Sequence, residues 1–153
     1  MIKPITHSIL ELRKPCLPIE KGENILPILN DLMETLATVK GYALAGNQIR
    51  YFKQIAYIKA LDYKGQHYPE MVLINPKITA KAQKIVYSES CLSFPGLTIQ
   101  TQRYLFIWLQ NTNIKGEIQE PVMYQDLMAI IIQHECMHIN SKILMDFSYR
   151  KLR

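Results

Sequence analysis

The stretch from Asp126 to Ile139, DLMAIIIQHECMHI, constrains the fold of this chain more than any other feature. It is long, mostly apolar and free of glycine and proline, which predicts a buried helix. Two histidines four residues apart, His134 and His138, share one face of such a helix, and Glu135 directly follows the first. These polar groups need partners or a function, because burying them together without either is costly.

Periodicity elsewhere predicts one more helix and many short strands. Apolar residues at spacings of three and four predict an amphipathic helix between Asn24 and Val39. Between Gln54 and Gln119 the runs QIAYIKAL, EMVLIN and YLFIWLQ are typical of strands. Turn-forming pairs separate these runs at 64–65, 75–76, 95–96 and 115–116. We therefore expect an α+β fold, with mostly antiparallel strands packed around the central buried helix that carries the H-E-x-x-H motif.

Length and composition favour one globular domain over residues 1–153, with 48% hydrophobic residues to form its core. No run approaches the roughly 18 apolar residues that cross a bilayer, so no membrane partner is expected. The N-terminus lacks the features of a secretory signal, which makes a cytoplasmic location the expectation. Three cysteines without a framework spacing argue against structural disulfides. The net charge of +5 favours acidic surfaces such as RNA but indicates no specific nucleic-acid partner.

The H-E-x-x-H motif favours a metal site. His134 and His138 can present ring nitrogens to one cation, while Glu135, rotated by about 100°, can reach a metal-bound water without competing as a ligand. A divalent metal lowers the pKa of that water, and a carboxylate can take and return its proton. The alternative is a polar patch satisfied within the core, which the cost of burying three polar groups makes the weaker interpretation.

The third ligand is expected upstream of the helix. Only fifteen residues follow His138, and they contain no His, Cys or Glu. Three upstream candidates, His7, Cys16 and His67, are isolated among unrelated residues. Cys136 projects to roughly the opposite face from His134, so we interpret it as a small core residue.

Cys91 is the strongest candidate, because it lies in SESCLSFPG between an apolar run and a Pro-Gly turn. Its alternative role is that of a nucleophile with a histidine base. With both helix histidines committed to a metal, ligation is the better use of the thiolate. A Cys-His-His set leaves a fourth position open for water, which is typical of catalytic sites.

Three segments resemble the signature motifs of the peptide deformylase family: GYALAGNQ at 41–48, ESCLS at 89–93 and QHECMH at 133–138. Their order and separation also match, and the resemblance extends from about Ile5 to Phe147. The resemblance implies a hydrolase of protein biosynthesis that removes the formyl group of N-terminal formylmethionine from new bacterial or organellar proteins. It implies one divalent metal ion, usually Fe(II), with zinc, nickel or cobalt as substitutes. The implied partners are the formylmethionyl peptide and, transiently, the ribosome.

Carried over by position, the resemblance implies a role for each motif residue. The implied metal ligands are Cys91, His134 and His138, and the implied general acid/base is Glu135. Gln48 and the backbone N–H of Leu92 would hold the developing oxyanion of the formyl carbonyl. Removing one such donor typically costs about 10²–10³ in rate. Outside its motif, Gln48 would be interpreted as an ordinary surface glutamine.

The substrate pocket follows in part from helical geometry. Leu127, Ile130 and Ile131 lie on the His134 face of the helix, where they can wall a slot for the methionine side chain or simply pack in the core. The resemblance adds Tyr42, Ala43 and Tyr87 as substrate-binding residues. It also implies a pair between Glu89 and Arg103 that positions the cysteine loop.

The chain departs from the family pattern at four positions, none of which is an implied ligand or the base. Ala43 replaces a glycine, which would impair a backbone that needs a positive φ there, and Gly46 replaces an alanine. Ser90 stands where glycine is common, and Met137 where aspartate is common. The chain resembles short members that lack a C-terminal helix extension. Two alternative functions remain: another metal-dependent amidase or peptidase, and a non-catalytic peptide-binding homologue.

Overall fold

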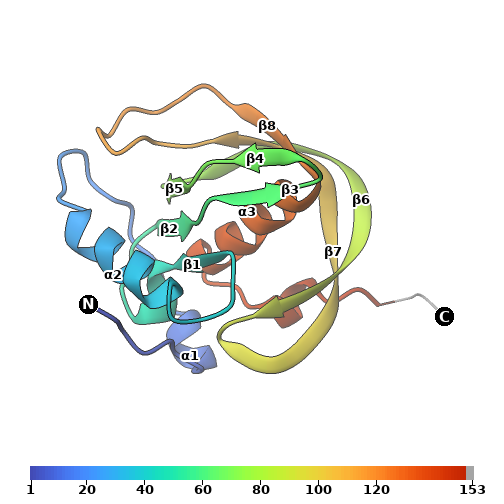
Figure 1. Ribbon diagram of the computed structural model, residues 1–153, viewed down its shortest axis with the longest axis horizontal. Helices are drawn as coiled ribbons and strands as arrows, with labels where there is room; N and C mark the ends of the chain where they lie inside the picture. Colours follow the sequence, from blue (N-terminus) through green and yellow to red (C-terminus); the bar gives the residue numbers. More distant parts are fainter. Residues whose placement is uncertain (151–153) are drawn as a thin grey trace.

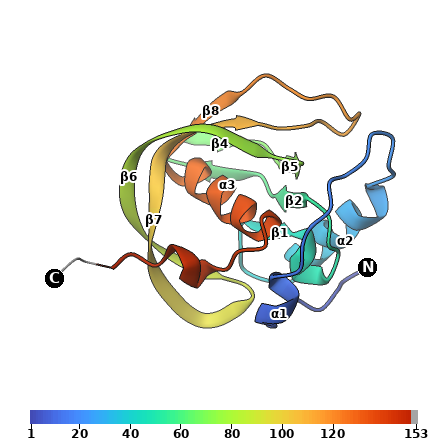
Figure 2. The same ribbon diagram turned by 180° about the vertical axis from the view of Figure 1, so that it is seen from behind.

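Helix α3 (Asp126–Ile139) runs through the middle of the fold, with strands packed on more than one side of it. The computed structural model describes residues 1–150 (Figures 1 and 2). All residues of α3 except Asp126 and His134 are buried. The expectation of a central buried helix within mostly antiparallel strands is therefore confirmed.

Three antiparallel sheets surround this helix. The first has the order β1-β2-β5 and contains β1 (Ala43–Ala45), β2 (Ile55–Ile58) and β5 (Met71–Ile74). The second is a hairpin of β3 (Leu61–Tyr63) and β4 (Gln66–Tyr68). The third has the order β6-β7-β8 and contains β6 (Lys77–Cys91), β7 (Phe94–Gln110) and β8 (Val122–Gln125). The remaining elements are α1 (Ile9–Leu12), α2 (Leu26–Leu36) and the 3-10 turns η1 (Gly46–Ile49) and η2 (Leu144–Phe147).

Strand β2 explains why one apolar run lacks polar alternation. All four of its residues are buried. Ala56 and Ile58 pack in the cluster that contains α3, whereas Ile55 and Tyr57 pack in the cluster that contains α2. A strand covered on both faces is apolar throughout, so the β1-β2-β5 sheet forms a layer between the two helices.

The predicted helix between Asn24 and Val39 is confirmed with shorter bounds. It begins at Leu26, with a proline in its first turn, and ends at Leu36. Ile28, Leu32 and Leu36 are buried, as their spacing predicts.

The prediction of many short strands does not describe β6 and β7. They span 15 and 17 residues and form a curved hairpin that wraps around one side of α3 (Figures 1 and 2). Most residues of β6 are exposed, so the strand contains no apolar run of the kind that predicts a buried strand. Strands β1 and β8 also lie outside the region from Gln54 to Gln119 in which strands were expected.

The turn that carries the cysteine motif is also displaced from its predicted place. The chain reverses at Leu92 and Ser93, not at the Pro-Gly pair. Ser90 pairs with Thr98 but Cys91 pairs with Phe94, so residues 95–97 form an irregularity within β7. Gly96 has a φ of +80°, which glycine adopts without strain. The hairpin thus ends in a tight turn directly after Cys91.

A side-chain amide fastens α3 to β7. Gln133 Oε1 accepts a hydrogen bond from the backbone N–H of Tyr104 (2.9 Å), and Gln133 Nε2 donates to the carbonyl of the same residue (2.8 Å). The contact fixes α3 one residue before His134. Within residues 1–150, no helix combines the length and apolar character needed to cross a membrane.

Candidate metal centre and active site

The three predicted ligands converge although they come from two distant parts of the chain. Cys91 is the last residue of β6, and His134 and His138 lie one turn apart on α3. His138 Nε2 is 3.2 Å from His134 Nε2 and 3.4 Å from Cys91 Sγ. The donor atoms of all three residues lie within 4.8 Å of one another.

These distances fit a divalent metal ion. A tetrahedral ion holds imidazole nitrogens at about 2.0–2.1 Å and a thiolate at about 2.3 Å, which places neighbouring ligand atoms about 3.3–3.6 Å apart. The pKa values of the two histidines shift in opposite directions, and burial together with the charge of His134 lowers the pKa of His138. Burial lowers the pKa of His134, but hydrogen bonds with Cys91 and Glu89 outweigh it and raise the pKa to about 10. The partners that favour positive charge on His134 would also favour a bound cation, which would take the place of the proton on its Nε2.

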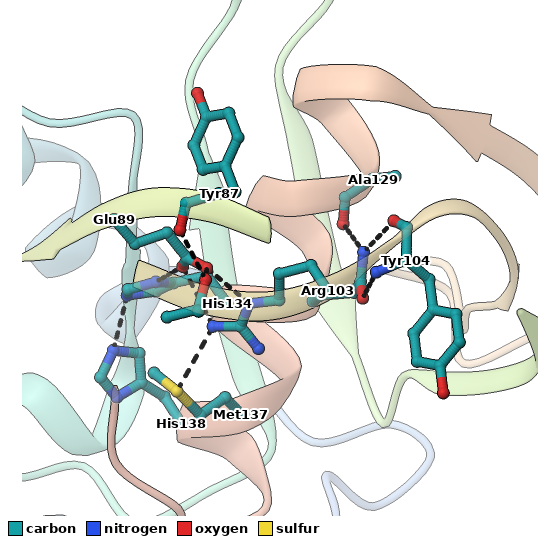
Figure 3. A network of polar contacts seen from close by, with 10 residues as sticks. Tyr87, Glu89, Arg103, Tyr104, Ala129, His134, Met137 and His138 are labelled. Atoms are coloured by element: carbon teal, nitrogen blue, oxygen red, sulfur yellow. Dashed lines mark hydrogen bonds and ion pairs between the residues drawn. The ribbon is translucent and has the colours of Figure 1, made fainter. Parts of the chain in front are cut away.

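Glu89 orients the His134 ring (Figure 3). Its carboxylate accepts hydrogen bonds from His134 Nδ1 (2.8 Å), from Arg103 Nε (2.6 Å) and Nη2 (3.0 Å), and from the hydroxyl of Thr101. Burial raises the pKa of Glu89, but the bonds from His134 and Arg103 dominate and lower it to about 2. Because the carboxylate can only accept, Nδ1 keeps its proton, which leaves Nε2 as the atom that would ligate a metal in exchange for its own proton.

Glu135 lies on the wall of the pocket beside the metal cluster. Its side chain is buried, and its Oε1 has no hydrogen-bond partner among residues 1–150. Burial raises the pKa of this carboxyl to about 7, although the nearby His134 opposes the shift. A carboxylate with a pKa near neutrality can both take up and release a proton under physiological conditions.

Gln48 is held at both ends of its side-chain amide. Its Oε1 accepts from the backbone N–H of Ala45 (3.0 Å), and its Nε2 donates to Ser93 Oγ (3.1 Å). Nε2 also lies 3.8 Å from Cys91 Sγ, at the edge of the metal cluster. The amide is therefore held on the wall of the pocket, beside the Cys91 thiol.

The pocket has a volume of about 450 Å³. All six residues expected to bind substrate line it: Tyr42, Ala43, Tyr87, Leu127, Ile130 and Ile131. Gln48 and Leu92 line it as well, whereas His138 and Arg103 are buried. Tyr42 and Tyr87 are 52% and 38% exposed, so they can contact a ligand that extends to the surface.

The remaining thiols and histidines lie apart from the metal cluster. Cys136 packs in the main core, where burial raises the pKa of its thiol to about 12. His67 pairs with Asp62 on the exposed β3-β4 hairpin. His7, which the sequence leaves isolated, donates from Nδ1 to the carbonyl of Ser93 (3.0 Å) and so contacts the cysteine turn.

Two departures from the family pattern have a structural account. Ala43 lies in β1, paired with Ile58, and is not among the residues with positive φ, so its backbone is not strained. Gly46 is required by close packing, because a Cβ there would lie 2.8 Å from the carbonyl oxygen of Tyr51.

Several supporting residues were missed by sequence reasoning. They are Thr101, which bonds Glu89; Ser93, which bonds Gln48; and Asn47, whose Nδ2 donates to the carbonyl of His138 (2.8 Å). Asn47 and Ser93 lie in the motifs at 41–48 and 89–93, so their place in those motifs could have identified them. Thr101 lies in β7, outside these motifs, and no local sequence pattern distinguishes it.

Comparisons with known proteins agree with this geometry. Residues 2–152 match the family model described as Polypeptide deformylase. The peptide deformylase of Buchnera aphidicola subsp. Acyrthosiphon pisum (strain Tuc7) is 30% identical over 148 residues, which are 96% of this chain and 83% of that protein. A crystal structure of a peptide deformylase from Legionella pneumophila has a TM-score of 0.85 at 26% identity, covering 97% of this chain and 87% of that one.

A Met-Ala-Ser-bound class I type b peptide deformylase from Acinetobacter baumannii has the same fold. Its TM-score is 0.84 at 21% identity, with 96% of this chain and 98% of that chain covered. The resemblance found in three short motifs thus extends over nearly the whole sequence and the whole fold. The chain belongs to the polypeptide deformylase family.

Proposed function

We propose that this chain removes the N-terminal formyl group from formylmethionyl peptides of newly made proteins and releases formate. One observation carries the proposal: in a member of the deformylase family, Cys91, His134 and His138 converge beside an unpaired Glu135 on the wall of one pocket. Neither alternative function, another metal-dependent amidase or peptidase or a non-catalytic peptide-binding homologue, has a comparable observation in its favour.

We propose that Cys91, His134 and His138 would hold one divalent metal ion. Family resemblance favours Fe(II), with zinc, nickel or cobalt as substitutes, and a thiolate with two imidazoles suits each of these metals. When bound, such an ion polarises a carbonyl and lowers the pKa of water.

Glu135 is the proposed general acid/base. Its carboxylate takes a proton from the attacking water and delivers it to the departing amine. The pKa of about 7 supports this assignment, because the same group must accept a proton and then donate it.

Gln48 and Leu92 are the proposed oxyanion donors. Attack on the formyl carbon places negative charge on the formyl oxygen, and donors already fixed in position stabilise that charge without reorganising. The two hydrogen bonds that hold the Gln48 amide support its role. Leu92 follows Cys91 in the turn, and its side chain packs closely over Gly41.

We propose that the apolar wall of Leu127, Ile130 and Ile131 receives the methionine side chain. Tyr42 and Tyr87 would flank the peptide that follows, with Ala43 beside it in β1. The Met-Ala-Ser bound to the Acinetobacter baumannii deformylase agrees with a pocket that takes an N-terminal methionine.

The setting of the reaction is also a proposal. We infer that residues 1–153 act as one catalytic domain in the cytoplasm and meet the ribosome transiently, because the substrate is a newly made protein. Family membership supports both inferences.

A comparison of three peptides tests the proposed function. The protein, prepared anaerobically with Fe(II) or loaded with Ni(II), should release formate from formyl-Met-Ala-Ser and leave acetyl-Met-Ala-Ser intact. Cleavage of internal peptide bonds at a similar rate would instead indicate a general peptidase. Binding of the formyl peptide by the metal-loaded protein without any formate release would indicate a non-catalytic homologue.

A further inference from the structure

The guanidinium of Arg103 is buried with a single carboxylate partner. Arg103 is 2% exposed, and both of its close ion-pair contacts go to Glu89 (Figure 3). Among residues 1–150, Glu89 is the only carboxylate within ion-pair distance of it. Glu89 is shared with His134 and Thr101, so one carboxylate serves three donors.

Two neutral side chains also contact the Arg103 guanidinium. The Met137 sulfur lies 3.7 Å from Nη2, and the guanidinium carbon lies 4.6 Å from the centre of the Phe147 ring. A guanidinium over an aromatic face is attracted by the negative potential of that face, more strongly when both are shielded from water. The Phe147 ring thus adds a second attractive contact to Arg103, besides its ion pair with Glu89.

Phe147 is itself fixed in place. It closes η2, whose Leu144 is fully buried in a small cluster with Cys91 and Met137. Directly after it, Ser148 forms a bridge to Thr101, and the N–H of Tyr149 donates to the carbonyl of Gln100 (2.8 Å). The segment after α3 is therefore bound to β7 at the residues that flank the Glu89 network.

We propose that Phe147 is a positioning residue of the metal centre, which acts through Arg103 and Glu89 on the orientation of His134. The proposal rests on the proposed metal site. Without the ring, Arg103 can tilt toward the space that the ring filled, and Glu89 can follow it. His134 would then be held less firmly at Nδ1, and its Nε2 would be a poorer ligand.

The test measures how the protein holds cobalt(II). In Phe147→Leu, an excess of chelator should remove cobalt about 3- to 10-fold faster than from the unsubstituted protein, below the 10- to 100-fold cost typical of a direct partner of a ligand. The visible absorption spectrum of the cobalt protein should shift, since it reports the ligand geometry. Phe147→Tyr keeps the aromatic face and should restore both properties.

Phe52→Leu is the matched control, because Lys14 lies 5.0 Å from the centre of the Phe52 ring in a contact of the same kind away from the metal cluster. It should leave cobalt release and the spectrum unchanged. If Phe147→Leu does not fold, Phe147→Met, which is also apolar and lacks a ring, takes its place. Unchanged cobalt release in the ringless variant, or an equal change in Phe52→Leu, would overturn the proposal. Failure of the unsubstituted protein to bind cobalt would overturn the proposed metal site and this inference together.

Discussion

Replacement of Glu89 by glutamine should destabilise the fold and weaken the metal centre at the same time. Glu89 is 5% exposed, and its carboxylate accepts hydrogen bonds from His134, Arg103 and Thr101. Glutamine has nearly the same size, but it carries no charge to offset Arg103. Its NH₂ group would also face donors instead of acceptors.

The pKa of Glu89 gives the expected loss of folding stability. Its folded pKa of about 2, against the ordinary value of 4.5 for a glutamate, corresponds to about 3 kcal/mol of stability near neutral pH. Breaking a buried ion pair by removing one partner costs about 3–5 kcal/mol, which agrees. Because the folded pKa lies below the unfolded one, the contribution is fully present above about pH 4.5 and is lost as the pH falls toward 2. At pH 3.5 about 2 kcal/mol should remain.

Urea unfolding of the metal-free protein at pH 7 and pH 3.5 measures this contribution as the difference between Glu89→Gln and the unsubstituted chain. Glu11→Gln is the matched control, because Glu11 also accepts from a threonine and an arginine, Thr6 and Arg50, but at the surface. Because solvent screens the Glu11–Arg50 pair, Glu11→Gln should lose much less unfolding free energy than Glu89→Gln. A difference for Glu89→Gln that equals the control, or that grows as the pH falls, would refute the reasoning.

Three further predictions follow from the site. Cys91→Ala should lose metal while Cys136→Ala retains it, because only the Cys91 thiol lies beside the two helix histidines. Metal analysis of both purified variants decides this, and the reverse pattern would show that the ligand set is wrong. Ser93→Ala should lower kcat about tenfold with metal content unchanged, because Gln48 loses the bond that orients its Nε2, and an unchanged kcat would count against this role. Gly46→Ala should reduce the free energy of unfolding by about 1–3 kcal/mol, because the new methyl group would lie 2.8 Å from the carbonyl oxygen of Tyr51. Thermal and urea unfolding would detect this loss, and unchanged stability would contradict the packing argument.

The elements that periodicity describes well were predictable from the sequence. Helix α3 is mostly apolar because all of its residues except Asp126 and His134 are buried, and α2 shows one apolar face because its other face is exposed. The long hairpin of β6 and β7 was not predictable in the same way. It curves around the helix with one face largely in solvent, so most residues of β6 are polar or small and produce no apolar run.

Some residues of the candidate site were predictable from the sequence, and others were not. The H-E-x-x-H spacing by itself identifies two donors and a base, because the helix period fixes their directions. The family resemblance was needed for Gln48, since nothing local distinguishes it from a surface glutamine. Thr101 and Phe147 could not be found by either route, because their importance comes from tertiary contacts to Glu89 and Arg103 that no local spacing encodes.

The most direct test of the central claim is to measure metal content and formate release on one preparation of Glu135→Gln. Glutamine keeps the size of the side chain but cannot carry a proton at neutral pH. Because the proposed ligands Cys91, His134 and His138 are untouched, the variant should retain its metal. Formate release from formyl-Met-Ala-Ser should fall by at least about 10²–10⁴-fold, the usual contribution of general acid–base catalysis. Near-normal turnover in a metal-loaded Glu135→Gln protein would contradict the assignment of Glu135 as the catalytic base.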